Sequence, residues 1–264
     1  MINPEAAWPA ALPPDAVCFT VDVEWADRAV LDDLCGLFDA HGVRATFFVT
    51  HDGVQVPGHE RGLHPNFLRS GDSYRRFLQA RGADASEPSD GDVQRAIITM
   101  THGFASEAKG VRSHALYYVA TLLPLYRAQG LEYECSYQLP LVSGLRPFWK
   151  EHDIVALPTY YADHFDLMGG VTGFDVGALH LERPGLKIFD FHPNMVFLNA
   201  CSTAHYDSTK AFYQEPERLL AARHPGRGIR SLLVDLLSFV AERRLQTLTA
   251  GEINTHWRTV PKWA

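Results

Sequence analysis

The sequence lacks the long hydrophobic segments of a membrane protein. No apolar run approaches the roughly 20 residues that span a bilayer, so no membrane span is predicted. Residues 1–17, MINPEAAWPAALPPDAV, have neither the basic start nor the apolar stretch of a secretory signal. A cytoplasmic location is therefore expected.

Cysteine is scarce, with four residues in 264 and no CxxC spacing. Their scattered positions in apolar surroundings predict buried free thiols instead of disulfides or a cysteine-bound metal. Charged residues make up 21% of the chain without acidic or basic blocks, and the net charge is -7. This distribution gives no support to a surface for nucleic acid or anionic membranes.

No linker rich in glycine, serine or charge divides the chain, so residues 1–264 are predicted to form a single domain, with residues 1–16 as an N-terminal extension. Hydrophobic residues make up 46% of the sequence, which is enough for a sizeable core. Residues 69–91 are the most polar and least regular segment, and they are predicted to be a loop excursion.

Strand and helix patterns alternate along the chain. Residues 17–25, VCFTVDVEW, are rich in β-formers, residues 30–38 carry apolar side chains at helical spacing, and residues 45–50, ATFFVT, form another apolar run. This order predicts a parallel strand pair with a right-handed crossover. Further strands are predicted at residues 61–64, 109–114, 133–136, 154–158, 186–192 and 245–248, and further helices at 93–100, 117–129, 228–244 and the C-terminus. Seven or eight strands alternating with helices favour an α/β fold, a (β/α) barrel, over an open sheet.

Ionisable side chains stand at the carboxyl ends of several of these predicted strands. In a (β/α) barrel the carboxyl ends of the strands form the active-site face, so such side chains converge. In a regular strand, side chains two residues apart also share a face. The residues at these ends are Asp22 and Glu24 in the first strand, His64 in the third, Arg112 and His114 in the fourth, and His192 in the seventh.

Simpler structural roles are open to the same residues. They are helix capping or pairing with Arg28 for the two carboxylates, a turn hydrogen bond for His64, an ion pair for Arg112 and a place in the core for His192. Their shared placement at strand ends favours the functional interpretation over these roles.

The segments that carry these residues resemble the polysaccharide deacetylase family, the carbohydrate esterases with a NodB-like domain. TVDVEW resembles the family's acidic first motif, VRATFFVT the following strand, GHERGLHP the segment with a metal-binding His, VRSH the Arg-containing motif and FDFHP the late catalytic His. The resemblance covers most of the chain. LHPNF and the late HPN and FLN segments are most similar to the WbmS-like branch, which is associated with bacterial surface-polysaccharide loci.

The resemblance implies a distorted barrel and an enzyme that removes an N-acetyl group from a sugar or glycan precursor by hydrolysis. It also implies a divalent metal, commonly zinc. By motif position, Asp22 would be the general base, Glu24 and His64 metal ligands, Arg112 the group that orients the base, His192 the acid that protonates the departing amine, and Asp163 in YYADHF the residue that orients His192.

The sequence departs from the family pattern at the second metal-binding His. Many members have this His four residues after the first, where this chain has Leu68, which cannot bind a metal. His114, at a neighbouring strand end, is predicted to take its place, with Asn66 or Asp22 as alternatives.

A second departure concerns the paired acids. The family commonly has two adjacent Asp residues, but here Val23 follows Asp22. Glu24 can replace the second acid, because side chains two residues apart in a strand point the same way.

These residue types suit amide hydrolysis, which needs an activated water, a stabilised carbonyl oxygen and a proton for nitrogen. A metal held by His and carboxylate ligands lowers the pKa of bound water to about 7, and a His with a pKa of about 6.5 can supply the proton. Two alternatives remain. One is a glycoside hydrolase that uses Glu24 with Asp163 or Asp190, which leaves the histidines without a role. The other is a non-catalytic carbohydrate-binding barrel with a decayed metal site, which Leu68 motivates.

Overall fold

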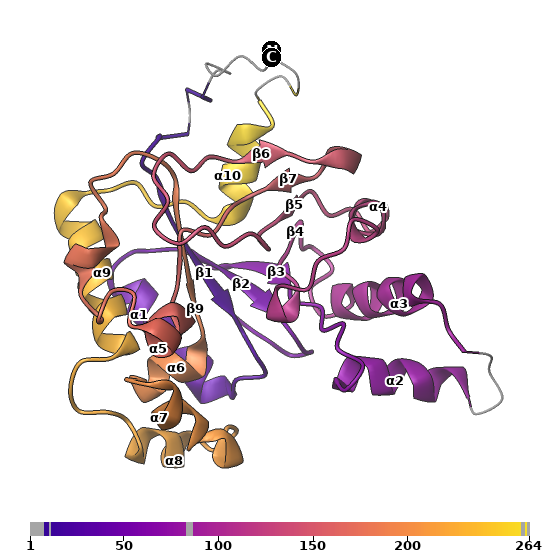
Figure 1. The fold of residues 1–264 in the computed structure, drawn as a ribbon, viewed down its shortest axis with the longest axis horizontal. Coiled ribbons are helices and arrows are strands. Elements are labelled where there is room, and N and C mark those ends of the chain that lie inside the picture. Colours follow the sequence, from indigo (N-terminus) through magenta and orange to yellow (C-terminus); the bar gives the residue numbers. More distant parts are fainter. Residues whose placement is uncertain (1–7, 11, 83–86, 260–261, 263–264) are drawn as a thin grey trace.

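The computed structural model describes residues 8–10, 12–82, 87–259 and 262. These residues form one curled sheet with helices packed outside it (Figure 1). The strands are β1 (Val17–Asp22), β2 (Ala45–Val49), β3 (Glu60–Leu63), β4 (Gly110–Val111), β5 (Tyr133–Glu134), β6 (Phe148–Trp149), β7 (Val155–Ala156), β8 (Tyr161–Ala162) and β9 (Lys187–Phe191). Their order across the sheet is β6-β7-β5-β4-β3-β2-β1-β9-β8.

Most of the helices lie outside the sheet or beyond its carboxyl edge, whereas the last helix lies against β1 and β2 near their amino ends (Figure 1). They are α1 (Arg28–Ala40), α2 (Asp72–Arg81), α3 (Asp90–His102), α4 (Leu122–Ala128), α5 (His164–Gly169), α6 (Pro193–Leu198), α7 (Thr203–Asp207), α8 (Pro216–Ala221), α9 (Ile229–Arg243) and α10 (Ala250–Trp257), with short 3-10 turns η1 (His114–Leu116), η2 (Glu151–Asp153), η3 (Val176–Leu179) and η4 (Lys210–Phe212). None of the helices in the described ranges has the length and apolar character needed to cross a membrane.

The predicted α/β fold, a distorted (β/α) barrel, is confirmed, although the described sheet has nine strands instead of the predicted seven or eight. Eight strands of the described sheet run parallel, and β6 pairs antiparallel with β7 at one edge. The two edge strands, β6 and β8, are not paired with each other within the described part of the chain. The sheet is therefore a curled half-barrel that does not close.

Alternate residues of β1 enter two different cores, which explains why the whole strand is buried. Phe19 and Val21 pack in the large outer cluster with residues of α1, α6 and α9, whereas Cys18 packs in a smaller cluster inside the curl. Helix α10 closes that inner cluster, and the backbone N–H of Ala250 donates to Thr46 Oγ1 at the amino end of β2. Asp22, on the inner face with Cys18, thus lies at the open carboxyl end of the curl.

Several predicted strands are shorter in the structure. The first ends at Asp22 instead of residue 25, and the fourth contains only Gly110 and Val111 of the predicted 109–114. The strand predicted at 245–248 is wrong, because only an isolated bridge joins Thr247 to Val17. In each case the backbone turns away to place a side chain or to enter a helix.

The predicted loop over residues 69–91 is also wrong in part. Helix α2 occupies Asp72–Arg81 and α3 begins at Asp90, while residues 83–86 lie outside the described residues. The two helices lie side by side and project from the sheet (Figure 1). Of the predicted extension 1–16, residues 1–7 and 11 lie outside the described residues, and Leu12 and Ala16 are buried in the inner cluster.

Candidate metal centre and active site

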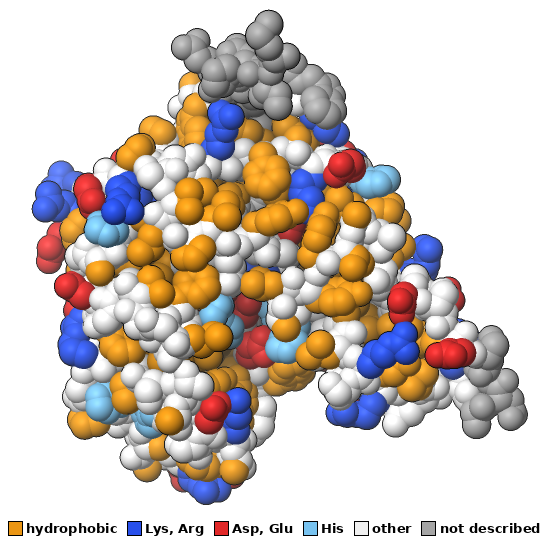
Figure 2. All heavy atoms as spheres, in the orientation of Figure 1, with side chains coloured by type: hydrophobic (Ala, Val, Ile, Leu, Met, Phe, Trp, Pro, Cys, Tyr) orange, Lys and Arg blue, Asp and Glu red, His pale blue; other side chains and the backbone are white. Residues whose placement is uncertain are grey.

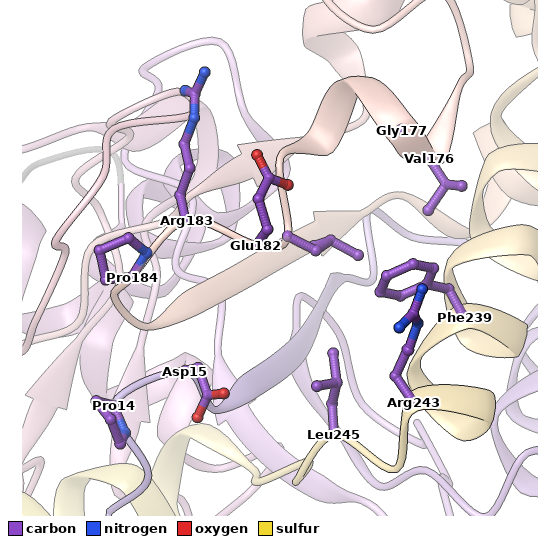
Figure 3. Close-up of a pocket in the computed structure, with 11 residues that line it drawn as sticks. Pro14, Asp15, Val176, Gly177, Glu182, Arg183, Pro184, Phe239, Arg243 and Leu245 are labelled. Atoms are coloured by element: carbon purple, nitrogen blue, oxygen red, sulfur yellow. The ribbon is translucent and has the colours of Figure 1, made fainter.

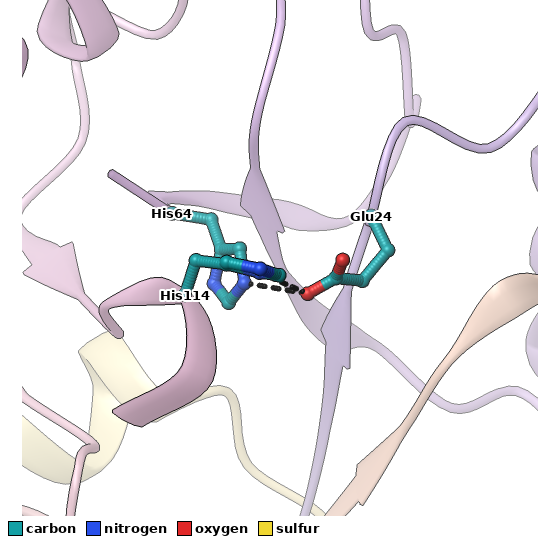
Figure 4. Close-up of side chains that lie close together, drawn as sticks. All are labelled: Glu24, His64 and His114. Atoms are coloured by element: carbon teal, nitrogen blue, oxygen red, sulfur yellow. Dashed lines mark hydrogen bonds and ion pairs between the residues drawn. The ribbon is translucent and has the colours of Figure 1, made fainter. Parts of the chain in front are cut away.

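Glu24, His64 and His114 come together at the carboxyl end of the curled sheet. Glu24 Oε1 lies 3.0 Å from His64 Nε2 and 2.7 Å from His114 Nδ1. Figure 4 shows both imidazole rings directed at this one carboxylate. Burial alone would raise the pKa of Glu24, but the hydrogen bonds from His114 and His64 hold it well below its ordinary value.

Glu24 reaches this place through a turn and not through strand alternation. β1 ends at Asp22, and both Glu24 (φ 49°) and Trp25 (φ 58°) have left-handed backbones. The turn is held by the backbone N–H of Trp25, which donates to Thr50 Oγ1 at 3.1 Å. The period-two argument for a shared face of Asp22 and Glu24 is therefore wrong, although the two side chains do converge.

The two histidines are placed by main-chain bonds that continue the sheet. The N–H of His64 donates to Val49 O at 2.8 Å, directly after β3, and the N–H of His114 donates to Pro65 O at 3.0 Å. His114 therefore lies next to His64 in the structure, although 50 residues separate them in the chain.

Arg112 joins two carboxylates from neighbouring strands. Its Nη1 donates to Asp22 Oδ1 at 3.0 Å and to Asp190 Oδ1. Its other nitrogens donate to Cys135 O and Thr159 Oγ1, and its guanidinium lies 4.6 Å from the centre of the Phe48 ring. The side chain is fully buried, so these contacts fix the position of Asp22.

The two carboxyl groups on Arg112 have opposite pKa shifts. Burial would raise the pKa of Asp22, but the charges of His64 and Arg112 hold it below its ordinary value. Burial raises the pKa of Asp190 to about 7 in spite of Arg112. Asp22 is therefore the carboxylate that stays ionised and can act as a base at neutral pH.

His192 and Asp163 form a second pair on the other side of Asp22. Asp163 Oδ1 lies 2.7 Å from His192 Nδ1, and Asp163 Oδ2 accepts from the backbone N–H of His192 at 2.7 Å. Burial would lower the pKa of His192, but the charge and hydrogen bond of Asp163 raise it well above its ordinary value. His192 is therefore held in its protonated form at neutral pH.

All the predicted site residues are linked in this way. Asp22 connects the two halves, since its Oδ1 is 3.6 Å from His64 Nδ1 and its carboxylate lies with Asp190 and His192 in a group whose atoms are within 4.8 Å of one another. A pocket of about 510 Å³ opens over four of them, Asp22, Glu24, His114 and His192. Figure 2 shows histidine and acidic side chains gathered in the hollow near the centre of one face.

The further residues that line this pocket include Asp190, His164 and Tyr206. Asp190 was predicted only as a carboxylate of the alternative glycoside hydrolase, and it lies within an apolar strand, KIFDF. His164 directly follows Asp163 in the sequence, which is the signal that could have identified it, and its ring centre lies 5.8 Å from that of His192. Tyr206, on α7, carried no signal in the sequence.

Another hollow, of about 720 Å³, lies at the opposite end of the sheet (Figure 3). It is lined by Asp15, which precedes β1, by Glu182 to Pro184, which precede β9, and by Phe239 and Arg243 of α9. Because the site residues follow the carboxyl ends of the strands, this hollow is remote from them and contains none of them.

The comparisons with known proteins agree with this geometry. A family model described as a WbmS-like polysaccharide deacetylase matches residues 19–210. The chain belongs to this family. The predicted family is therefore confirmed, and a comparison with curated proteins found no match.

Solved structures of polysaccharide deacetylases share the fold of this WbmS-like chain. The crystal structure of WbmS from Bordetella bronchiseptica, described as a polysaccharide deacetylase involved in O-antigen biosynthesis, is 27% identical, with a TM-score of 0.71 over 86% of this chain and 91% of that chain. A Mycobacterium smegmatis structure with a polysaccharide deacetylase description is 15% identical, with a TM-score of 0.57 over 98% of this chain and 96% of that chain. The second likeness shows the fold alone.

The residues of this family member fit a divalent metal. Glu24, His64 and His114 offer a carboxylate and two imidazoles within 4.8 Å of one another, a donor set that suits zinc and similar ions. His64 Nδ1 is also a buried polar atom without a hydrogen-bond partner, and Asp22 is near it. Leu68, at the family's second His position, is 41% exposed, and Asn66 Oδ1 accepts from the Leu68 N–H. His114 is thus better placed than Asn66 to replace the missing ligand.

Proposed function

We propose that this polysaccharide deacetylase is a metal-dependent hydrolase that removes an N-acetyl group from a sugar or glycan precursor. One observation carries the proposal. Glu24 and His114 of the Glu24, His64 and His114 cluster line the same pocket as His192 of the His192–Asp163 pair, and Asp22, in contact range of both groups, lines it too. A base, an acid and a set of metal ligands are thus arranged around one space.

Glu24, His64 and His114 would hold the metal, with Asp22 as a further candidate. When bound there, a divalent ion lowers the pKa of a water molecule and polarises the acetyl carbonyl. Asp22 accepts the proton that the attacking water loses. Arg112 orients Asp22 and keeps it ionised, because it is buried beside the carboxylate and donates to it.

His192 supplies the proton that the departing amine needs. Its Nδ1 is engaged by Asp163, so Nε2 is the nitrogen left to face the substrate. The raised pKa of His192 keeps this proton in place at neutral pH. Water is consumed, the C–N bond breaks, and acetate and a free amine are the products.

The substrate is proposed to be a glycan precursor of a bacterial surface polysaccharide. The support is the 27% identical WbmS structure, whose description places that protein in O-antigen biosynthesis. The expected cytoplasmic location would agree with a precursor as substrate, and it remains part of the proposal.

The proposal is tested by measuring bound metal and released acetate on the same preparation. We expect one divalent ion for each chain, loss of acetate release on chelation, and recovery on adding zinc. Asp22→Asn should lower kcat at least about 100-fold. Asp27→Asn is the matched control, because Asn also caps α1, where Asp27 accepts from the Ala29 N–H.

Two outcomes would contradict the proposal. Cleavage of glycosidic bonds that survives exhaustive chelation would establish a glycoside hydrolase. A protein without stoichiometric metal, whose glycan binding is the same in Asp22→Asn, would be a non-catalytic carbohydrate-binding barrel.

A further inference from the structure

Tyr206 brings a phenol hydroxyl into the active-site pocket. It lies on α7, outside the strand ends that supply most of the site, and it lines the pocket together with Asp22, Glu24 and His192. Among the described residues that line this pocket, Tyr206 is the only one with a hydroxyl group. The hydrolysis proposed above leaves this group without a role.

The segment that carries Tyr206 is fixed at both of its ends. At the start of α7, Thr203 Oγ1 donates to Leu167 O of α5 at 2.8 Å, and Figure 1 shows α7 beside α5. After η4, Gln214 Nε2 donates to Trp25 O, in the left-handed turn of the candidate metal centre. The helix that presents the phenol is therefore tied to the same turn that places the metal-binding carboxylate.

The hydrogen bond between two phenols makes Tyr206 a donor toward the pocket. The hydroxyl of Tyr213 donates to the oxygen of Tyr206. Burial raises the pKa of Tyr206 to about 12, against the effect of this bond, so Tyr206 keeps its own proton at neutral pH. A hydroxyl has one proton to donate and can accept at the same time. Because the Tyr206 oxygen accepts from Tyr213, its O–H proton remains for a ligand.

Tyr206 lies between the two halves of the site. The charges of Glu24 and Asp163 both act on its phenol, and these belong to the metal cluster and to the His192 pair respectively. His164 lies instead beside His192, with 5.8 Å between the ring centres. Water that adds from the metal side and an amine that leaves on the His192 side place the acetyl carbon between these halves. The Tyr206 hydroxyl is thus on the part of the pocket wall that faces the acetyl group.

The proposed reaction creates a negative charge on the acetyl oxygen. Water adds to the carbonyl carbon, the electron pair of the C=O π bond moves to the oxygen, and Asp22 takes the proton of the water. The pair returns to carbon when the C–N bond breaks and His192 protonates the nitrogen. Asp22 and His192 are therefore engaged with other atoms. A fixed donor aimed at the oxygen accelerates such a step, because the charge appears only on the way to the transition state.

We propose that the Tyr206 hydroxyl donates a hydrogen bond to the acetyl oxygen as this charge develops, which makes Tyr206 a catalytic residue. This inference rests on the proposed function. It assigns a reacting group to α7, outside every segment that carries the family resemblance.

The kinetic test compares acetate release from N-acetylglucosamine with trifluoroacetate release from its N-trifluoroacetyl analogue. Tyr206→Phe removes the hydroxyl and keeps the ring. We expect kcat for the acetyl substrate to fall about 100-fold with little change in KM. The loss for the trifluoroacetyl substrate should be less than about tenfold, because fluorine stabilises the oxyanion and weakens the hydrogen bond that it accepts. Tyr74→Phe on α2, which removes a phenol hydroxyl outside the pocket, is the matched control and should keep both rates.

Three kinetic results would overturn the inference. Equal losses for the two substrates in Tyr206→Phe would show a structural role for the hydroxyl. A rise in KM at unchanged kcat would show a contact with the sugar in the ground state. A 100-fold fall of kcat in Gln138→Leu but not in Tyr206→Phe would assign the donor to Gln138, whose amide also lines the pocket.

Binding of methylphosphonate to the zinc-loaded protein gives a readout without turnover. Its methyl group and tetrahedral oxygens resemble the species that water forms with an acetyl group. We expect the dissociation constant from calorimetry to rise about tenfold in Tyr206→Phe and to stay unchanged in Tyr74→Phe.

The binding and kinetic results together separate this inference from the proposed function. Unchanged methylphosphonate binding and unchanged kcat in Tyr206→Phe, in a protein that releases acetate, would overturn the inference and leave the deacetylase proposal intact. Weaker methylphosphonate binding in Tyr206→Phe, in a protein that releases no acetate, would support the contact from Tyr206 and defeat the proposed function instead.

Discussion

Asp163 holds His192 with both of its carboxylate oxygens. Oδ1 lies 2.7 Å from the ring Nδ1, and Oδ2 accepts from the backbone N–H of the same residue at 2.7 Å. The carboxylate therefore fixes the orientation of the ring and of the peptide that carries it. It also stabilises the protonated ring, because Asp163 is fully buried and its charge is poorly screened.

We expect Asp163→Asn to lower kcat about 100-fold with a smaller change in KM. Asp163 raises the pKa of His192 against the effect of burial. Without that charge the pKa of His192 falls, so the acid form is lost at lower pH. The alkaline limb of the kcat–pH profile should therefore move to lower pH, while Asp175→Asn, at an exposed turn, should leave it in place. An unmoved limb would contradict the assignment of His192 as the acid.

His64→Ala and His114→Ala should each remove most of the bound metal, because each leaves one imidazole with Glu24. Metal content is measured by mass spectrometry, and metal binding is followed by the rise in melting temperature on adding zinc, since a ligand that binds only the folded state stabilises it. His256→Ala on α10 is the control. A stoichiometric ion in His114→Ala would assign the missing ligand to another residue, with Asp22 as the first candidate.

Asp190→Asn should gain stability relative to the wild type as the pH rises from 4 to 8. The pKa of Asp190 is raised by burial to about 7 in the folded protein, and that of an unfolded Asp is about 3.9. Between these values the folded state binds the extra proton, so the Asp190 contribution is full below pH 4 and declines as pH rises through 7. Asn does not titrate and removes that decline. Parallel pH profiles of the urea midpoint for the two proteins would show that the pKa of Asp190 is not raised in the folded protein.

Arg244→Gly should stabilise the protein by about 1 kcal/mol, because Arg244 ends α9 with a left-handed backbone (φ 53°) that Gly adopts without strain. Glu242→Gly, two residues earlier and inside the helix, should destabilise it by about the same amount. Urea unfolding measures both. Equal destabilisation by the two changes would show that the conformation at residue 244 is not strained.

Much of the fold follows from local patterns that the sequence contains. The apolar runs of β1, β2 and β9 and the stripe of α9 are buried as the periodicity predicts. Helix α2 was missed because only Phe77 in it is buried, so its hydrophobic pattern is too weak to indicate a helix. Strand β8 is set by pairing with β9, which is distant in the sequence, and β6 by a two-residue pairing with the nearby β7, and both strands are too short to show a local pattern.

The site was predictable to the extent that its residues stand at strand ends. His64 and His192 follow directly on β3 and β9, and the structure places them as that rule expects. Asp190 could not be placed in this way, because its partner Arg112 lies 78 residues away and the bond forms only when the strands assemble. His164 directly follows Asp163 in the sequence, and this proximity to a predicted site residue could have indicated that His164 is part of the site.

The left-handed turn at Glu24 and Trp25 limits how this centre can vary. A left-handed backbone is tolerated by Gly, Asn and Asp and is costly for β-branched residues. Position 24 can therefore exchange one oxygen ligand for another, such as Asp, by a single substitution. Val, Ile or Thr there would require the whole turn to be rebuilt. Which substitutions the site can accept thus depends on the left-handed backbone conformation at positions 24 and 25 as much as on the ligands themselves.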